Sequence, residues 1–399
     1  VEQPVGRILD KSGRGNHAIQ ATTTKRPIYS RRVNLLTKTD AAFSVSPWVM
    51  AGTTASGSRI TATAVNSNHI GYQPYAHVPD VPVRYRVQVA KKIGFGFFQL
   101  CYSNPARVKC TVNLETGEFV VSKLGGADAV VTVTDTGTGR WEITITGSSS
   151  TTIGTGYFNM GPTTSLSEAV NPYQEPVFTG TGEYIDVYEP DLRLATDAHL
   201  PYQRVNTATD YDADPSKFPA YLRFDGVDDA LQTGNIDFTG TDKMTVVAGV
   251  RSNLNGYSNI LELGPNSASE NGFSLQRGWA ANGDYAGIAY GTSLGYGYTS
   301  NFAAPDTSVI AAQYDIAQAS VFGGEISFRR NGVVSAKAET QGSAGTGNFS
   351  QKPLYIGSRA GTSFPFNGRI YSLIVRGAQT PLSQIEATER YIKQKMRLP

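Results

Sequence analysis

Short runs of alternating apolar and polar residues recur along almost the whole chain, and this pattern constrains the fold more than any other feature. Because side chains on a β-strand point alternately to opposite faces, such runs predict strands with one buried face. The 42 glycines and 20 prolines supply the turns between them. The pattern therefore predicts an all-β protein. The clearest runs lie at residues 84–89, 96–100, 111–114, 141–146, 244–250, 259–263, 309–314 and 368–375.

One helix is expected near the end of the chain. Thr380 is suited to cap it, and Pro381 is suited to its first position. Ile385, Ile392 and Met396 follow at helical spacing and would line a single buried face. The expected fold is therefore all-β with one C-terminal helix.

Length, charge and hydropathy narrow the class of protein. A chain of 399 residues is long for one sandwich and suits two domains. The 35 basic and 33 acidic residues nearly cancel, and basic residues form only doublets, so we expect no nucleic-acid binding. No apolar run reaches the roughly 18 residues of a membrane span, so we expect no membrane insertion. Because the chain starts at Val1 and shows no signal peptide, we expect a processed product or a fragment.

Cys101 and Cys110 are too few for a disulfide-stapled scaffold. They flank a predicted hairpin connection, where a bridge is geometrically possible, although two reduced, half-buried thiols are favoured. Neither cysteine has a histidine or a second cysteine at the spacing of a metal site.

Two segments far apart in the sequence carry the motifs of one domain type. Residues 10–18 read Asp-Lys-Ser-Gly-Arg-Gly-Asn-His-Ala, and residues 224–229 read Phe-Asp-Gly-Val-Asp-Asp. Both resemble the laminin-G-like, concanavalin A-like domains of bacteriophage tail and prophage proteins, which start with a D-x-SG-x-GNHA stretch and follow it with an F-D-G-x-x-D turn. The resemblance implies one concanavalin A-like β-sandwich built from residues 1–33 and 206–399.

The segment between them, residues 34–205, resembles a second phage module. Residues 113–119 and the following Gly139-Arg140-Trp141 are similar to the D-L-x-T-G … G-x-G-W-x-R signature of jelly-roll modules in phage tail proteins. The sequence departs from that signature at Arg140-Trp141-Glu142, where such modules usually have Trp-Tyr-Arg. The resemblance implies an inserted jelly-roll carbohydrate-binding-like β-sandwich, because a folded domain with adjacent ends can enter a surface loop of another. Alternatively, residues 1–33 pack on the inserted module instead.

These resemblances together imply a virion protein of the phage tail. The expected function is non-enzymatic receptor binding: an extracellular tail fibre or tail tip that recognises a bacterial surface glycan. Such fibres are usually homotrimers, and this one is expected to contact other tail subunits. The step from fold to glycan is analogy, because β-sandwiches host many functions. Two alternatives stay open: a tail protein that binds a host protein such as a pilus or another virion subunit, and a polysaccharide depolymerase.

The depolymerase alternative depends on paired carboxylates. Retaining hydrolysis needs two of them about 5 Å apart. Glu183, Asp186 and Glu189 follow one another at intervals of three residues. On a strand, alternation would therefore point Asp186 away from the other two side chains. The segment therefore does not predict a hydrolytic cleft, and no nucleophile elbow, P-loop or dinucleotide fingerprint appears in the sequence.

An acidic turn offers a metal site. Asp225, Asp228 and Asp229 present carboxylate oxygens, the ligands that a calcium ion prefers. The same residues suit turn chemistry, since Asp accepts local backbone N–H bonds and Gly226 tolerates unusual dihedral angles. The turn is the favoured interpretation and a structural calcium the alternative.

Aromatic residues among Gly, Asn and Ser predict the ligand-binding surface. Rings stack on the C–H faces of sugars while polar neighbours bond the hydroxyls. The same composition suits a protein-binding surface or a strand-turn-strand with core-facing tyrosines. The residues predicted to bind ligand are Trp279, Asn282, Asp284, Tyr285, Tyr290, Tyr296 and Tyr298, with Tyr72, Tyr75 and His77 in the insert.

Overall fold

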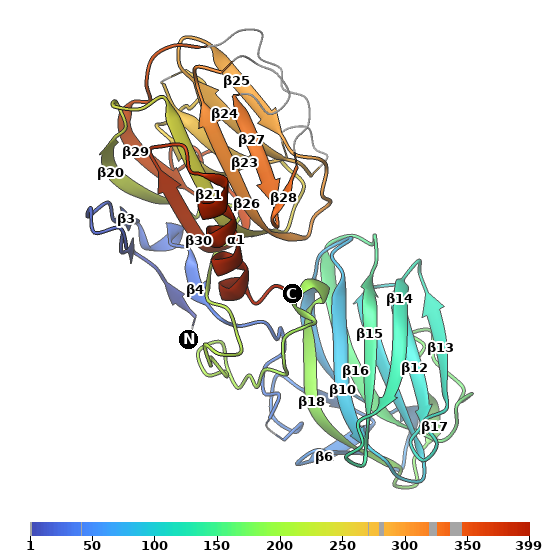
Figure 1. Ribbon diagram of the computed structural model, residues 1–399. Helices are drawn as coiled ribbons and strands as arrows, with labels where there is room; N and C mark the ends of the chain where they lie inside the picture. The colour runs from blue at the N-terminus through green and yellow to red at the C-terminus, as the bar shows by residue number, and fades with distance from the viewer. Residues whose placement is uncertain (1, 41, 270, 279–282, 319–324, 336–344) are drawn as a thin grey trace. The chain divides into compact units, whose positions relative to one another are not determined.

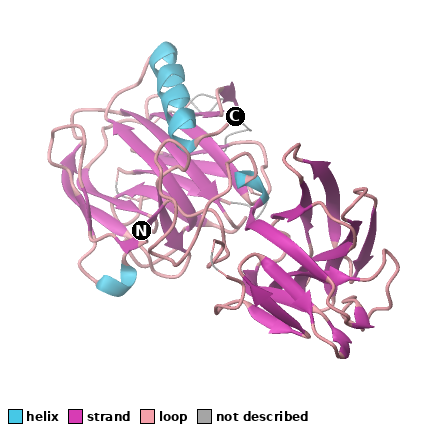
Figure 2. Ribbon diagram, turned by 90° about the horizontal axis from the view of Figure 1, so that it is seen from below, coloured by secondary structure: helices cyan, strands magenta, loops and turns pink. Residues whose placement is uncertain are grey.

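The computed structural model describes residues 2–40, 42–269, 271–278, 283–318, 325–335 and 345–399. Within these residues the chain forms two units, one of residues 32–217 and the other of residues 2–31 and 218–399. Each unit is an antiparallel β-sandwich, and the one α-helix of the described residues lies at the C-terminus (Figures 1 and 2). The predicted fold class is therefore confirmed.

The unit of residues 2–31 and 218–399 is built from two eight-stranded sheets. The first runs β1 (Gln3–Pro4), β4 (Ile28–Ser30), β19 (Tyr221–Asp225), β30 (Asn367–Arg376), β21 (Lys243–Ser252), β26 (Asp306–Asp315), β27 (Ile326–Arg330), β28 (Val333–Val334). The second runs β2 (Arg7–Ile8), β3 (Ala18–Ile19), β20 (Leu231–Asp237), β29 (Gln351–Ile356), β22 (Ser258–Leu263), β23 (Phe273–Arg277), β24 (Tyr285–Tyr290), β25 (Leu294–Tyr298). The opening strands thus pair in both sheets with strands of the second segment, β4 with β19 and β3 with β20.

The helix α1 (Leu382–Met396) covers the outer face of the first sheet. Its buried residues include the predicted Ile385, Ile392 and Met396, which pack against Val247, Val309 and Ala311. Its start differs from the prediction. Pro381 is the N-cap residue rather than the first helical residue, and no side chain caps the helix. The Thr380 hydroxyl instead accepts a hydrogen bond from Arg376 at 3.4 Å.

The unit of residues 32–217 has two six-stranded sheets and a two-stranded one. The first runs β14 (Asp128–Asp135), β15 (Arg140–Ser148), β10 (Val83–Ala90), β18 (Tyr184–Leu194), β7 (Arg59–Ala62), β6 (Thr53–Ser56). The second runs β13 (Phe119–Leu124), β12 (Ala106–Asn113), β11 (Phe95–Ser103), β16 (Gly154–Thr163), β9 (Ile70–His77), β5 (Val49–Ala51). The small sheet pairs β17 (Val177–Thr179) with β8 (Asn66–Asn68). In the core between the larger sheets, the rings of Tyr85 and Phe158 stack with their centres 3.9 Å apart.

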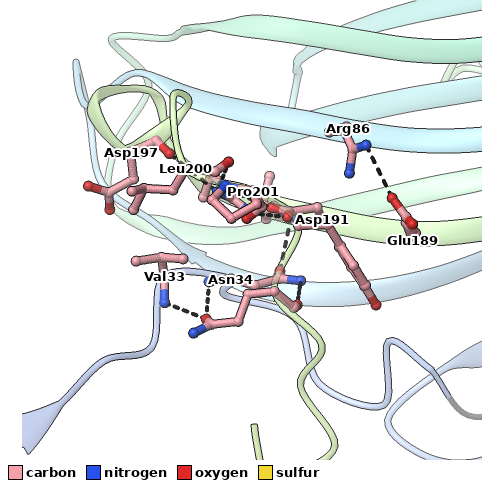
Figure 3. A network of polar contacts seen from close by, with 12 residues as sticks. Val33, Asn34, Arg86, Glu189, Asp191, Asp197, Leu200 and Pro201 are labelled. Carbon is pink, nitrogen blue, oxygen red and sulfur yellow. Dashed lines mark hydrogen bonds and ion pairs between the residues drawn. The ribbon is translucent and has the colours of Figure 1, made fainter. Parts of the chain in front are cut away.

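The two ends of the 32–217 unit are tied together inside it. The Gln203 side chain accepts hydrogen bonds from the backbone N–H groups of Val33 (2.7 Å) and Asn34 (3.1 Å), which Figure 3 labels. Its amide group donates to the Asp212 carbonyl at 2.8 Å. Residues 206–217 therefore belong to this unit, whereas the expected boundary lay at residue 205.

A buried ion pair completes this closure. Arg193 and Asp191, respectively 1% and 0% exposed, are joined through two charge-assisted hydrogen bonds near the end of β18. The same guanidinium donates to the carbonyl oxygens of Leu200 (2.9 Å) and Pro201 (3.0 Å), which fixes the segment that follows the strand (Figure 3). A buried charge that is both paired and fully hydrogen-bonded is tolerated, whereas an unpaired one is strongly destabilising.

The two cysteines are unbridged. Cys101 and Cys110 are both free and buried rather than half-buried, and they lie on opposite faces of the β11–β12 hairpin, since Cys110 belongs to the core cluster and Cys101 does not. No described helix combines the length and the apolar character that a membrane crossing requires.

Candidate ligand-binding surfaces

The acidic turn joins β19 to β20 and is held by its own carboxylates. Asp225 Oδ1 accepts hydrogen bonds from the N–H groups of Val227 (2.8 Å) and Asp228 (3.3 Å), and Asp229 Oδ2 accepts one from Asp225 N–H (3.0 Å). Gly226 provides the left-handed backbone of the turn, with φ of +78°. These are the local bonds that turn chemistry predicts.

The same three carboxylates converge. One oxygen from each of Asp225, Asp228 and Asp229 lies within 4.8 Å of the others. Burial of Asp229, with the negative charges of Asp225 and Asp228 beside it, raises the pKa of that carboxyl to about 6. Clustered oxygen ligands with excess negative charge are a donor set that fits a hard cation such as calcium.

Three of the predicted tyrosines share one face of the second sheet of the 2–31/218–399 unit. Tyr296 and Tyr298 alternate along β25, and Tyr290 ends the neighbouring β24. The strand register pairs Tyr296 with Ile288 and Tyr298 with Ala286. Because paired residues of an antiparallel sheet point to the same side, all these side chains lie on the outer face, where the three rings are partly exposed.

The reverse face of the same strands carries glycine. Gly287 pairs with Gly297. A Cβ on Gly297 would lie 2.7 Å from Ile326 of β27, and one on Gly287 would lie 3.0 Å from the same side chain. The absence of side chains at these two positions lets the sheet pack closely on β27. The tyrosines of β25 alternate with these glycines and therefore project outward.

A row of residues continues the tyrosine face across the sheet. The pairing leads from Ile288 to Ser274 of β23, then to Glu262 of β22 and Tyr355 of β29. Glu262 is fully buried and is paired with Arg359, whose Nε lies 3.1 Å from each carboxylate oxygen. Ser274 and Ile288 are also buried, so along this row it is the tyrosine rings that are partly exposed.

Two predicted ligand residues of this unit do not reach that face. Tyr285 is buried in the core, where its hydroxyl donates to Asp306 at 2.8 Å. Asp284 is only 2% exposed. Both assignments are corrected, because Tyr285 stands at the inward-pointing parity of β24 and Asp284 is enclosed at the start of that strand. Trp279 and Asn282 lie outside the described residues.

The predicted residues of the insert divide between the two faces of β9. Tyr72 lies on the outer face, where its ring meets that of Tyr157 edge-on at 5.7 Å. Tyr75 and His77 point inward and are 7% and 1% exposed, which corrects their assignment to a ligand surface. Burial raises the pKa of Tyr75 well above its usual value and lowers the pKa of His77. Sequence reasoning missed Tyr157, which only strand pairing brings beside Tyr72.

Two of the three carboxylates of residues 183–189 are paired with arginines. Asp186 pairs with Arg59 at 2.8 Å and Glu189 with Arg86 at 3.1 Å, the second pair being labelled in Figure 3. The side chains do not alternate along β18 as expected. The pairing of β18 with β10 shifts register next to Glu189, which has a φ of +51°, and this shift puts Glu189 on the same side as Asp186. Glu183 instead accepts hydrogen bonds from the N–H group and the hydroxyl of Thr181 (2.7 Å each), and Arg86 also pairs with Glu142 at 2.7 Å.

No protein-family model and no curated protein sequence matches the chain. Domains LG4-5 of the mouse laminin α1 chain are 13% identical over 83% of this chain and 94% of that one, with a TM-score of 0.28. The CBM40 domain of the Ruminococcus gnavus IT-sialidase, bound to α2,3-sialyllactose, is 16% identical over 40% of this chain and 97% of that one, with a TM-score of 0.29.

A third similar structure is the binding domain of botulinum neurotoxin serotype G. It is 9% identical over 43% of this chain and 42% of that one, with a TM-score of 0.33. All three are β-sandwich domains of laminin-G-like or carbohydrate-binding type. Every TM-score lies below 0.5.

Proposed function

We propose that this protein is a non-enzymatic glycan-binding component of a phage tail, and that it contacts a bacterial surface saccharide at the outer face of β24 and β25. The observation that carries the proposal is the alignment of Tyr290, Tyr296 and Tyr298, partly exposed on one face of the sheet. The phage context is supported by the motifs at residues 10–18 and 224–229.

The chemistry of the face suits a sugar. Tyrosine rings offer flat apolar surfaces to the C–H faces of a pyranose, and their hydroxyls bond its polar edge. The strand that carries Tyr296 and Tyr298 belongs to a wide antiparallel sheet, so the spacing of the rings is set by backbone geometry rather than by a mobile loop. Repetition of such a weak site in a homotrimer, with the other tail subunits holding the copies together, would supply avidity.

The proposal includes a structural calcium ion at the acidic turn. Asp225, Asp228 and Asp229 would hold it through carboxylate oxygens, and its charge would offset the burial and the neighbouring negative charges that together raise the pKa of Asp229. The turn leads directly into β20, whose Gln232 pairs with Tyr355 at the far end of the row. The ion would therefore fix one border of the outer face.

The first experiment measures binding of the labelled full chain to an array of purified bacterial surface polysaccharides. The test variant is the double substitution Tyr296→Ala with Tyr298→Ala. The matched control is Tyr391→Ala on α1, because Tyr391 is 50% exposed and lies away from this sheet. A thermal melt of each variant confirms that the fold is intact.

The expected result is a specific glycan that the wild type and the Tyr391 variant bind and the double variant does not. Retained binding by the double variant would overturn the site. A blank array with folded protein would overturn glycan recognition and favour a host protein or another virion subunit as the partner. A fall in the length of a bound polymer, followed by size-exclusion chromatography, would overturn the non-enzymatic assignment.

A further inference from the structure

The second six-stranded sheet of the 32–217 unit carries an aromatic ring on a rigid turn. Asn171 holds this turn: its side-chain oxygen accepts the N–H groups of Tyr173 (2.8 Å) and Glu175 (3.1 Å), and its amide donates to the Glu175 carboxylate (2.8 Å). Gln174 adopts the left-handed conformation, with φ of +59°, at the tip. Tyr173 is therefore presented on a fixed backbone, and it is 51% exposed.

The turn is also fixed to the sheet beneath it. The Tyr173 carbonyl accepts hydrogen bonds from Gln99 Nε2 (3.0 Å) of β11 and Arg107 Nη1 (2.8 Å) of β12. The Arg107 guanidinium lies 5.2 Å from the centre of the Tyr173 ring. Because Arg107 is 3% exposed and holds both the backbone and the ring, Tyr173 needs no rearrangement to receive a ligand on its open side.

An unpaired ammonium group lies beside the two residues that hold this turn. Lys109 follows Arg107 by two residues on β12, so both project to the outer face, and the register sets Lys109 opposite Gln99. Lys109 is therefore flanked by both residues that hold Tyr173. It makes no ion pair or hydrogen bond with any described residue, while burial lowers the pKa of its amine.

The other charges of this face leave Lys109 uncompensated. Glu175, 8% exposed, is occupied by the amide groups of Asn68 (2.8 Å) and Asn171. Lys123 of β13 lies in register with the core residue Val108 and so projects to the other face, where it pairs with Asp128. The outer face thus carries two cations, Arg107 and Lys109, against one carboxylate.

We propose that Tyr173 and Lys109 form a second binding site of this protein, specific for an anionic saccharide, with the pyranose stacked on the ring and the anionic group on the ammonium. The inference rests on the proposed function only in taking a saccharide as the ligand; the site, the unit and the charge selectivity are different. The anionic group can be a carboxylate or a phosphodiester, because both accept hydrogen bonds from an ammonium.

The test compares three soluble polymers by isothermal titration calorimetry with the full chain: a uronic-acid polysaccharide, its carboxyl-reduced form and a phosphodiester-linked polysaccharide. The test variants are Lys109→Gln and Tyr173→Ala. Lys109→Arg serves as the conservative rescue, and Lys123→Gln is the matched control. We expect Lys109→Gln to weaken binding of an anionic polymer roughly tenfold or more, the usual effect of losing one charge-assisted hydrogen bond.

The outcomes separate this proposal from the previous one. Binding of the uronate or phosphodiester polymer that is lost in Lys109→Gln, restored in Lys109→Arg and unchanged in Lys123→Gln supports the second site and identifies its anion. Equal binding of the charged and reduced polymers, or unchanged binding by Lys109→Gln, overturns it. Loss of anionic binding in the Tyr296/Tyr298 variant alone overturns it too and leaves the β25 site standing. Absence of binding to any glycan overturns both.

Discussion

Arg31 donates a hydrogen bond from Nη1 to the carbonyl oxygen of Phe218, with the two atoms 2.6 Å apart. These are the last residue before the 32–217 unit and the first residue after it, and both belong to the other sandwich. The sandwich of residues 2–31 and 218–399 is thus closed at the point where its chain is interrupted. An insertion between such adjacent ends leaves the pairing of β4 with β19 intact.

The same closure exists within the insert, and Gln203 provides it. We expect Gln203→Ala to lower the free energy of unfolding of this unit by about 2–3 kcal/mol, because two buried N–H groups, of Val33 and Asn34, lose their acceptor. Urea unfolding followed by tryptophan fluorescence measures the change. The control is Gln88→Ala, a partly exposed residue of β10, for which a change below about 0.5 kcal/mol is expected.

Asp229 makes stability depend on pH. Its folded pKa of about 6 lies above the roughly 3.9 of an unfolded Asp, so ionisation opposes folding. In the presence of a chelator, protonated Asp229 therefore contributes most to the free energy of unfolding below about pH 4. This contribution is lost as the pH rises through 6. We expect Asp229→Asn to flatten this loss and raise the melting temperature at pH 7.

Calcium should act in the opposite direction. Added calcium is expected to raise the melting temperature of the wild type at pH 7 and to leave that of Asp229→Asn unchanged, since a ligand that binds only the folded state stabilises it. Equal shifts in both proteins would show that the ion binds elsewhere, and no shift in either would remove the metal from the acidic turn.

The reactivity of the two cysteines tests whether both are buried, unbridged thiols of the β11–β12 hairpin. Burial raises the pKa of Cys110 to about 12 and also raises the pKa of Cys101, so neither forms a thiolate near neutral pH. A thiol-specific chromogenic reagent should therefore titrate no cysteine in the native protein and both after unfolding in guanidinium. A count of zero after unfolding under non-reducing conditions would instead demonstrate a bridge.

Tyr285 is a core residue and lies outside the proposed binding face. Tyr285→Phe removes the hydrogen bond to Asp306 and should cost about 1–2 kcal/mol of stability, more than a surface tyrosine would. Glycan binding should not change, because the side chain is fully buried. A binding defect in this variant without any loss of stability would restore Tyr285 to the binding surface.

The sequence predicted the strands well because alternation is a local property. Which tyrosine faces outward is not local: Tyr285 and Tyr296 occur in the same kind of glycine-rich segment, and only the pairing with β23 and β25 determines their sides. The turn that presents Tyr173 depends on contacts with Gln99 and Arg107, 74 and 66 residues away along the chain. No pattern within a window of a few residues contains that information.

The glycines behind the tyrosines determine which positions of this face can vary. On β25 the outward positions carry Tyr296 and Tyr298, while the inward Gly297 has no room for a side chain beside Ile326. Substitutions at the outward positions therefore change what the surface contacts without disturbing the packing behind it. The two rings can therefore be varied one at a time on the same scaffold, whereas Gly297 between them is free to change only together with β27.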